Sequence, residues 1–336
     1  MAQYRILSLD GGGIRGLVSA LLVQSLDTQF SILKNVDLFA GTSTGGIIAL
    51  ALAAGVPIAD VVSLYEKKGS VIFQSLDFTE CLFSAKRSAV ANFSLDPSEL
   101  YQAMYSSAGL KSELEAIVGS TATLGTTPKK ALVTTLQLRS SLPNNAWQPL
   151  AITNLAGSAN PAVDNATTLV DASMCSSAAP LYFPPHQHPV YGYCADGGVV
   201  ANNPAVVAIA SAIASGVLLK DIVMLSVGTG FSPSSMNITG NPDCYGINQW
   251  AWPESSGSQP AFAIISALFD GSSNVNDFEC KMLLGSAYIR SNPTITANIG
   301  LDDYQAVPTL ILDTTNYMQS ATSNWQSVVS FAKANF

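Results

Sequence analysis

Charged residues are scarce in this chain of 336 residues. Lysine, arginine, aspartate and glutamate together make up 11% of it, and the net charge is −8. A chain so acidic cannot neutralise the phosphates of a nucleic acid, so we expect no nucleic-acid partner. Strong attraction to anionic membranes is not expected either, and any contact with lipid must be mainly apolar.

Long hydrophobic runs are also missing, although hydrophobic residues make up 48% of the chain. No stretch reaches the roughly 18 apolar residues that span a bilayer. The first residues lack the basic and apolar regions of a signal peptide. We therefore expect a cytoplasmic protein that meets membranes, if at all, at their surface, and export by another route stays open.

Cysteine and histidine are few. The five cysteines are widely spaced and form no Cys-x-x-Cys pair, so the sequence indicates neither a zinc site nor a disulfide framework. The two histidines, His186 and His188, have no cysteine, aspartate or glutamate close by in sequence. We interpret them as loop residues, and we expect no metal and no other cofactor.

Strand patterns alternate with helix patterns along the chain, and no linker or repeat divides it. Such alternation predicts an α/β fold with a mainly parallel central sheet flanked by helices on both faces. We therefore expect one domain over 1–336, with core motifs in 4–230 and a helical C-terminal portion in 260–336. The predicted strands are 4–9, 36–40, 131–136, 150–154, 190–194 and 222–227, and the predicted helices are 46–54, 56–68, 170–178, 204–215, 260–286 and 315–334.

Two stretches are less regular. Within 69–125, Asp96 and the residues after it have the composition of a helix start. The stretch 231–259 is rich in Ser, Asn, Gly and Pro and is typical of a long loop; it carries Trp250 and Trp252. Either stretch could cover a site as a lid, and for 69–125 a scaffold role is the alternative.

Ser43 lies in Gly41-Thr42-Ser43-Thr44-Gly45, which fits the Gly-x-Ser-x-Gly nucleophile elbow. The pentapeptide alone occurs by chance in many glycine-rich loops. Here it stands between a predicted strand and a predicted helix, which is the context that the elbow needs. The turn would expose the serine hydroxyl at a helix N-terminus, where developing negative charge is favoured.

The segment Asp10-Gly11-Gly12-Gly13-Ile14-Arg15-Gly16 follows the first predicted strand directly. Its consecutive glycines expose backbone N–H groups, as an oxyanion hole requires. The same letters fit the Gly-x-Gly-x-x-Gly dinucleotide fingerprint, with Asp37 as its acid. That alternative leaves the serine elbow unexplained.

A serine nucleophile needs a base. Asp196, in Asp196-Gly197-Gly198 after a predicted strand, is the best candidate, and we infer a dyad of Ser43 with Asp196. An ordinary turn-capping role is the alternative for this aspartate. The hydrolase order Ser, acid, His stays possible only if Asp164 or Asp171 acts with His186.

Together the glycine loop, the serine elbow and Asp196-Gly197-Gly198 resemble the motifs of the patatin-like phospholipase family. The segment 176–185, Ser-Ser-Ala-Ala-Pro-Leu-Tyr-Phe-Pro-Pro, is similar to the stretch that precedes the aspartate in that family, and 281–290 resembles a family helix that leads into a Tyr-Ile-Arg strand. The resemblance implies a three-layer, modified α/β-hydrolase-like fold and a calcium-independent lipid acyl hydrolase. It assigns Ser43 as nucleophile, Asp196 as base, the amides of Gly11, Gly12 and Gly13 as oxyanion hole, and Arg15 and Thr44 as supporting residues.

The expected substrate is therefore a phospholipid or another acyl lipid, cleaved through an acyl-enzyme. Phe183, Trp250 and Trp252 could touch a lipid surface, with ordinary packing as the alternative for the tryptophans. Two other functions stay open: an acyltransferase or thioesterase that uses the same serine, and a lipid-binding or storage protein without catalysis.

Overall fold

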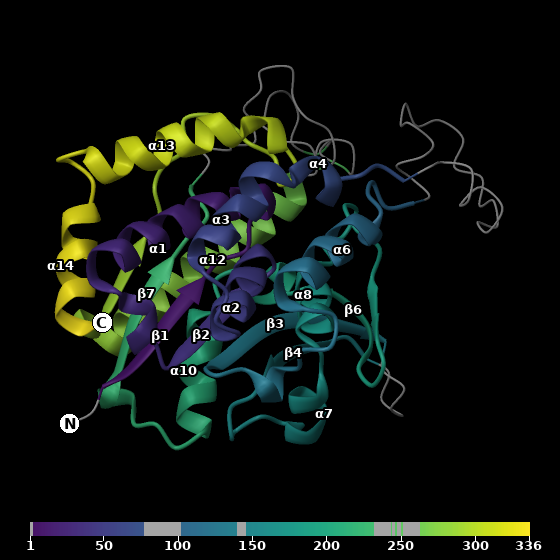
Figure 1. Ribbon diagram of the computed structural model, residues 1–336, viewed down its shortest axis with the longest axis horizontal. Helices are drawn as coiled ribbons and strands as arrows, with labels where there is room; N and C mark the ends of the chain where they lie inside the picture. Colours follow the sequence, from purple (N-terminus) through teal and green to yellow (C-terminus); the bar gives the residue numbers. More distant parts are fainter. Residues whose placement is uncertain are drawn as a thin grey trace.

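Figure 1 shows a computed structural model of the protein, which describes residues 3–76, 102–139, 146–231 and 263–336 and the single residues 243, 246 and 250. In these ranges eight strands form one mixed sheet, in the order β5-β6-β3-β2-β1-β7-β8 with β4 also paired to β3. The strands are β1 (Tyr4–Leu9), β2 (Leu38–Thr42), β3 (Lys130–Arg139), β4 (Gln148–Thr153), β5 (His186–His188), β6 (Gly192–Asp196), β7 (Ile222–Val227) and β8 (Tyr288–Ser291).

The five strands β3, β2, β1, β7 and β8 run parallel to one another, as the alternation of strand and helix predicts. Buried parallel strands consist of nearly continuous apolar runs, because helices cover both of their faces. Every residue of β2 and of β7 is buried accordingly. The predicted fold class, a mainly parallel sheet flanked by helices, is confirmed.

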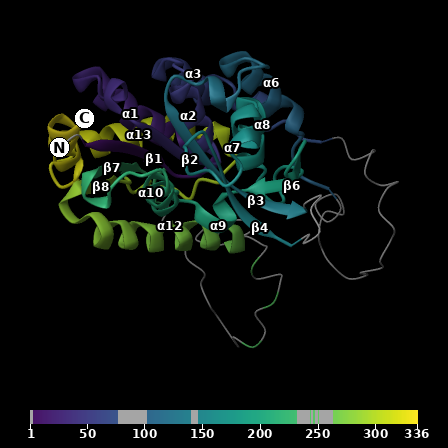
Figure 2. The same cartoon turned by 90° about the horizontal axis from the view of Figure 1, so that it is seen from below.

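Successive side chains of a strand point to opposite faces, so each face of the sheet has its own core. Leu7 and Leu9 of β1 join the larger core, while Ile6 joins the core on the other face. Figure 2 shows α1, α2, α3, α6 and α8 above the sheet and α9, α10 and α12 below it. The helices are α1 (Gly16–Phe30), α2 (Thr44–Ala53), α3 (Ile58–Lys67), α4 (Gly69–Ile72), α6 (Ser107–Val118), α7 (Pro161–Ala166), α8 (Leu169–Ser177), α9 (Gly198–Ala201), α10 (Ala205–Ala214), α12 (Ala263–Leu284), α13 (Val307–Gln319) and α14 (Trp325–Asn335).

One end of the sheet is antiparallel. Strand β3 extends past the end of β2, and both β4 and β6 pair with it in the antiparallel sense. Strand β5 completes a short hairpin with β6, so the prediction that His186 and His188 are loop residues is wrong. Three residues carry too little pattern to predict a strand, and it is the pairing with β6 that orders them.

Two strands run further than their apolar pattern predicts. Both β2 and β6 begin and end two residues later than expected, at Thr42 and Asp196. These terminal side chains are polar yet buried. A pattern of hydrophobic residues stops before such positions, although the backbone ladder continues through them.

The prediction of a single helix over 315–334 is also wrong, because two helices, α13 and α14, occupy this region. Between them the Ser323 hydroxyl donates to the Tyr317 carbonyl at 2.8 Å, and the Ser320 hydroxyl accepts from the Thr322 amide. Side-chain bonds of this kind compete with the helical ladder and end it. The helix start predicted at Asp96 and nearly all of the loop predicted at 231–259 lie outside the described residues.

Candidate active site

Ser43 occupies the sharp turn between β2 and α2, with a backbone φ of 53° and ψ of −123°. So strained a conformation for a side-chain-bearing residue persists only where the surroundings impose it, and it is typical of functional sites. The flanking glycines leave the necessary space: a Cβ on Gly41 would lie 2.1 Å from the Gly45 carbonyl oxygen. The predicted strand–turn–helix context of the serine is therefore present.

The Ser43 hydroxyl donates a hydrogen bond of 2.6 Å to Oδ2 of Asp196. The other carboxylate oxygen accepts from the Gly198 amide, also at 2.6 Å. Strand β3 brings the two side chains together, because Thr134 pairs with Thr42 at the end of β2, and the next residue, Thr135, pairs with Asp196 at the end of β6. The two residues singled out from the sequence thus meet, although 153 positions separate them.

Asp196 is fully buried. Burial raises the pKa of its carboxyl group to about 7, and the hydrogen bonds from Ser43 and from the Gly198 amide only partly oppose this rise. A carboxyl group with this pKa is far more basic than an exposed aspartate. A carboxyl group that titrates in the neutral range suits a role in which it must both accept and return a proton.

Ser176, at the end of α8, holds the turn from behind. Its hydroxyl accepts a hydrogen bond from the Ser43 amide at 2.8 Å and donates one to the Thr134 carbonyl at 2.7 Å. In the sequence, the segment 176–185 is noticeable only for its resemblance to the family, and this role of Ser176 was not predicted. The one available signal was a serine at the start of that segment, and its partner could not be deduced from spacing.

The glycine loop lies beside Ser43 with little free space. The Gly11 amide donates to the Asn202 carbonyl at 3.0 Å. This amide therefore has a partner within the protein, whereas the sequence predicted that it would donate to an oxyanion. The amides of Gly12 and Gly13 have no hydrogen-bond partner among the described residues. Gly13 adopts φ +58°, and a Cβ there would lie 2.1 Å from the Leu301 carbonyl oxygen.

The two supporting residues differ in their surroundings. Thr44 donates a short hydrogen bond to the Tyr65 hydroxyl in the wall of the site. Arg15 is buried, and its Nε has no partner within the part of the chain that the structure describes. Burial lowers the pKa of the Arg15 guanidinium, which the nearby Asp270 and Tyr182 partly offset.

A narrow cavity of about 50 Å³ opens beside Ser43 and Asp196. Its walls are almost entirely apolar, which suits an aliphatic chain rather than a polar group. Parts of 69–125 contribute Ile72, Phe73 and Leu110 to these walls, and Phe183 is buried there rather than displayed to a lipid surface. The remaining lining residues are Gly13, Ile14, Thr44, Ile47, Leu64, Tyr65, Ser177, Ala179, Tyr182 and Leu301.

A family model described as patatin-like phospholipase matches residues 7–209, more than half of the chain. The chain belongs to the patatin-like phospholipase family. The family is one of lipid acyl hydrolases, and the matched range contains the glycine loop, the serine elbow and Asp196.

Similar proteins include other patatin-like and phospholipase proteins. A cGAMP-activated phospholipase of Vibrio cholerae is 30% identical over 70% of this chain and 68% of its own length. One of Escherichia coli is 28% identical over 68% of this chain but only 62% of its own length. Patatin-like protein 4 of Arabidopsis thaliana is 25% identical over 83% of this chain and 72% of its own. Activation by cGAMP is stated in the names of the two bacterial relatives.

The other acid and base candidates of this patatin-like chain have partners away from the elbow. His186 pairs with Asp171 at 3.0 Å, and His188 with the Thr167 hydroxyl at 3.0 Å. Asp37, the acid of the dinucleotide alternative, accepts from the Arg5 amide near the start of β1, whereas the glycine loop follows the end of that strand.

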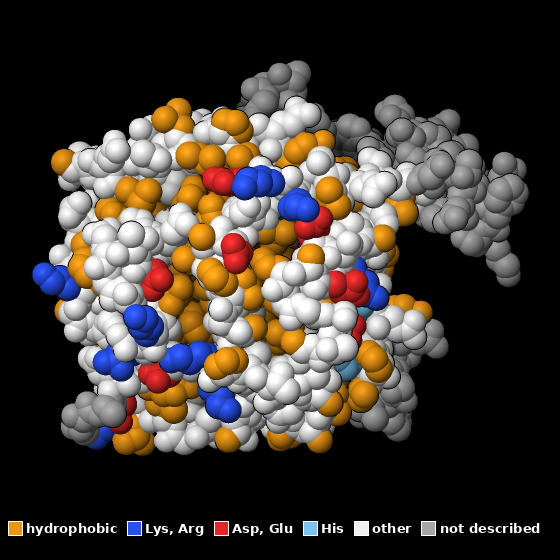
Figure 3. All heavy atoms as spheres, in the orientation of Figure 1, with side chains coloured by type: hydrophobic (Ala, Val, Ile, Leu, Met, Phe, Trp, Pro, Cys, Tyr) orange, Lys and Arg blue, Asp and Glu red, His pale blue; other side chains and the backbone are white. Residues whose placement is uncertain are grey.

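Neither a metal-binding cluster nor a membrane-spanning helix is present in the described ranges. No group of three or more His, Cys, Asp or Glu side chains there could hold a metal ion. None of the helices described is both long and apolar enough to cross a bilayer. Figure 3 shows that charged side chains are sparse on the face of Figure 1, where hydrophobic ones are widespread.

Proposed function

We propose that the protein hydrolyses fatty-acyl esters of glycerolipids, as a phospholipase A or lysophospholipase, through a dyad of Ser43 and Asp196. The observation that carries the proposal is the 2.6 Å hydrogen bond between the Ser43 hydroxyl and the Asp196 carboxylate at a strained turn. An apolar cavity beside this pair supports an acyl chain as the bound group.

Ionised Asp196 accepts the hydroxyl proton while Ser43 Oγ attacks the ester carbonyl carbon. The pKa of about 7 makes this carboxylate a competent base. Collapse of the tetrahedral intermediate releases the alcohol, which takes the proton from Asp196. Asp196 then removes a proton from water, which attacks the acyl carbonyl carbon of the acyl-enzyme. The bond between the acyl carbon and Ser43 Oγ breaks, Oγ takes the proton back from Asp196, and the fatty acid leaves.

The negative charge of the tetrahedral intermediate needs hydrogen-bond donors already in place. We assign this role to the amides of Gly12 and Gly13, which have no partner among the described residues, and no longer to the Gly11 amide. The N-terminus of α2, which begins directly after Ser43, adds its positive dipole end. Because base and oxyanion donors both come from the chain, we expect turnover to persist in EDTA.

The test is incubation with mixed-acyl phosphatidylcholine in EDTA, followed by mass spectrometry of the released fatty acids. Wild-type protein should release fatty acid, and Ser43→Ala should not. Ser173→Ala is the matched control, since it removes a buried serine hydroxyl on α8 that lacks a partner among the described residues. It should keep wild-type turnover.

Other outcomes would separate the alternatives. Transfer of the acyl group to an added alcohol or thiol in preference to water would replace hydrolysis by acyl transfer. Absence of turnover on every lipid, with no labelling of Ser43 by a fluorophosphonate and with lipid binding intact, would overturn the proposal in favour of a binding protein.

A further inference from the structure

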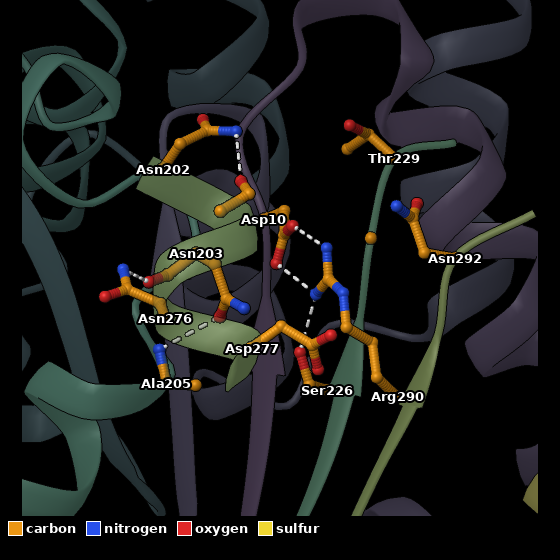
Figure 4. Close-up of polar contacts among 12 residues, drawn as sticks. Asp10, Asn202, Asn203, Ala205, Ser226, Thr229, Asn276, Asp277, Arg290 and Asn292 are labelled. Atoms are coloured by element: carbon orange, nitrogen blue, oxygen red, sulfur yellow. Dashed lines mark hydrogen bonds and ion pairs between the residues drawn. The ribbon is translucent and has the colours of Figure 1, made fainter. Parts of the chain in front are cut away.

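A buried ion pair lies directly behind the glycine loop. Asp10 is the residue between the end of β1 and the first glycine, and its carboxylate faces the Arg290 guanidinium (Figure 4). The pair is bidentate, with Nη1 donating to Oδ1 at 3.0 Å and Nη2 donating to Oδ2 at 2.5 Å. Two parallel bonds of this kind fix orientation as well as distance.

The pair is shielded from solvent, since the side chains of Asp10 and Arg290 are 4% and 10% exposed. Nη1 of Arg290 makes a further hydrogen bond of 2.8 Å to the Ser226 hydroxyl on β7. Although burial of the guanidinium opposes it, the Asp10 carboxylate raises the pKa of Arg290, so the arginine remains charged. A buried carboxylate without this counter-charge would be strongly unfavourable.

The next residue of the loop, Gly11, is held at both of its backbone polar groups. Its carbonyl accepts from the Thr229 hydroxyl at 2.9 Å and from Asn202 Nδ2 at 3.3 Å, and its amide donates to the Asn202 carbonyl. Gly12 packs closely against Thr229, since a Cβ on Gly12 would lie 2.2 Å from the Thr229 hydroxyl oxygen. Asp10 and Gly11 are thus held in place, and the amides of Gly12 and Gly13 follow directly after them in the loop.

Arg290, the partner of Asp10, comes from a distant part of the chain. Strand β8 is the edge of the sheet and pairs with β7, placing Arg290 opposite Ser226. It lies 280 residues from Asp10 and beyond residue 209, where the match to the family model ends. The C-terminal portion therefore contributes an anchor to a loop near the start of the chain.

We propose that Arg290 is a positioning residue, which clamps Asp10 and so holds the amides of Gly12 and Gly13 where the oxyanion forms. This role rests on the proposed function. Arg290 acts in two ways. It fixes the loop in place. It also neutralises the Asp10 carboxylate, which lies only two residues before Gly12 and three before Gly13, whose amides must donate to the negatively charged oxyanion. Neither effect involves contact with substrate.

The experiment compares Arg290→Gln and Arg290→Lys with wild type on a long-chain ester. We expect kcat to fall roughly 10²-fold in Arg290→Gln, as for a lost or displaced oxyanion donor, with KM within about twofold. Arg290→Lys keeps the charge but loses the bidentate geometry, so its kcat should lie between the kcat of wild type and that of Arg290→Gln.

A second readout distinguishes positioning from general stability. A long-chain trifluoromethyl ketone forms a tetrahedral adduct on Ser43 and needs the oxyanion amides, whereas an ether-linked lipid analogue does not. Affinity for the ketone should fall in parallel with kcat, and affinity for the ether lipid should stay unchanged. Asp313→Asn is the control, because Asp313 is a buried carboxylate of the C-terminal portion that bonds to Thr296 and not to the loop.

Three results would overturn the proposal: a wild-type kcat in Arg290→Gln, an equal loss of affinity for ketone and ether lipid, or an equal loss of kcat in an Asp313→Asn variant of similar melting temperature. If Arg290→Gln does not fold, Arg290→Lys and Asp10→Asn carry the same test, and failure of all three to fold would mean a purely structural pair. Absence of turnover in wild type would instead refute the proposed function itself.

Discussion

The Ser176 hydroxyl bridges the backbone of Ser43 to the middle of β3, accepting from the Ser43 amide at 2.8 Å and donating to the Thr134 carbonyl at 2.7 Å. Ser43 sits at φ 53°, a conformation that needs support from its neighbours. A single hydroxyl from another element thus provides part of that support.

Ser176→Ala tests this bridge. The variant leaves the Ser43 amide and the Thr134 carbonyl without this partner in a buried site, which costs about 1–3 kcal/mol in the free energy of unfolding. Because the turn loosens, kcat should fall roughly tenfold or more, given how steeply rate depends on alignment. Thermal unfolding and steady-state kinetics measure the two effects; unchanged kcat together with unchanged stability would contradict the role.

Activity should depend on the ionisation of Asp196. The base must be unprotonated, and its pKa is about 7. We therefore expect kcat/KM to rise about tenfold per pH unit below that value and to level off above it. A profile with its midpoint near pH 4 would show that an ordinary exposed carboxylate is the base.

The same pKa predicts an effect on stability. The folded-state pKa of Asp196 lies above its usual value of 3.8, so protonation favours the folded state. Its contribution is complete below pH 4, is lost as pH rises to about 7, and stays lost above that. Asp196→Asn, which cannot ionise, should then be more stable than wild type at pH 8, by up to about 4 kcal/mol, while losing activity. Chemical denaturation at pH 5 and pH 8 measures the difference, which should shrink to about 1.6 kcal/mol at pH 5, because that pH is only slightly above the usual pKa of 3.8.

Two glycines with different surroundings test the elbow. In Gly41→Ala the new Cβ would lie 2.1 Å from a backbone oxygen, so the turn must move, and we expect a loss of stability above about 2 kcal/mol together with loss of turnover. Gly55→Ala meets open space and only the strain of φ +86°, about 1 kcal/mol, and should keep wild-type turnover. Equal effects of the two substitutions on turnover would contradict the assignment.

A larger side chain in the wall of the cavity should leave less space for an acyl chain. Ala179→Leu adds three carbons to a buried lining position, so esters of long acyl chains should lose about tenfold in kcat/KM relative to butyryl esters, equivalent to about 1.4 kcal/mol. Ala212→Leu places the same extra volume in the core below the sheet and should leave that ratio unchanged. A ratio that moves equally in both variants would place the acyl chain elsewhere.

The sequence predicted the elbow because its determinants are local. A strand, two glycines and a helix stand side by side around Ser43, and each has its own pattern. The fold class followed from the same alternation of patterns. Asp196 was selected as an aspartate before two glycines, and resemblance to a family supported it.

The rest depends on contacts between distant elements, which no local pattern encodes. Ser176, Asn202, Thr229 and Arg290 reach the site from α8, the end of α9, the turn after β7 and the edge strand β8. The engagement of the Gly11 amide could not be predicted for the same reason, since its partner is 191 residues away in sequence. The break between α13 and α14 escaped because serine hydroxyls, rather than glycine or proline, end the helix.

Strand β3 has one further consequence. Its residue Thr134 pairs with the last residue of β2, and the next residue, Thr135, pairs with the last residue of β6. The distance between Ser43 and Asp196 is therefore set by the spacing of two consecutive residues of β3. Loops that join these strands can therefore gain or lose residues without altering that distance. A one-residue insertion within β3 at this step, by contrast, would move Asp196 to the opposite face and separate the pair.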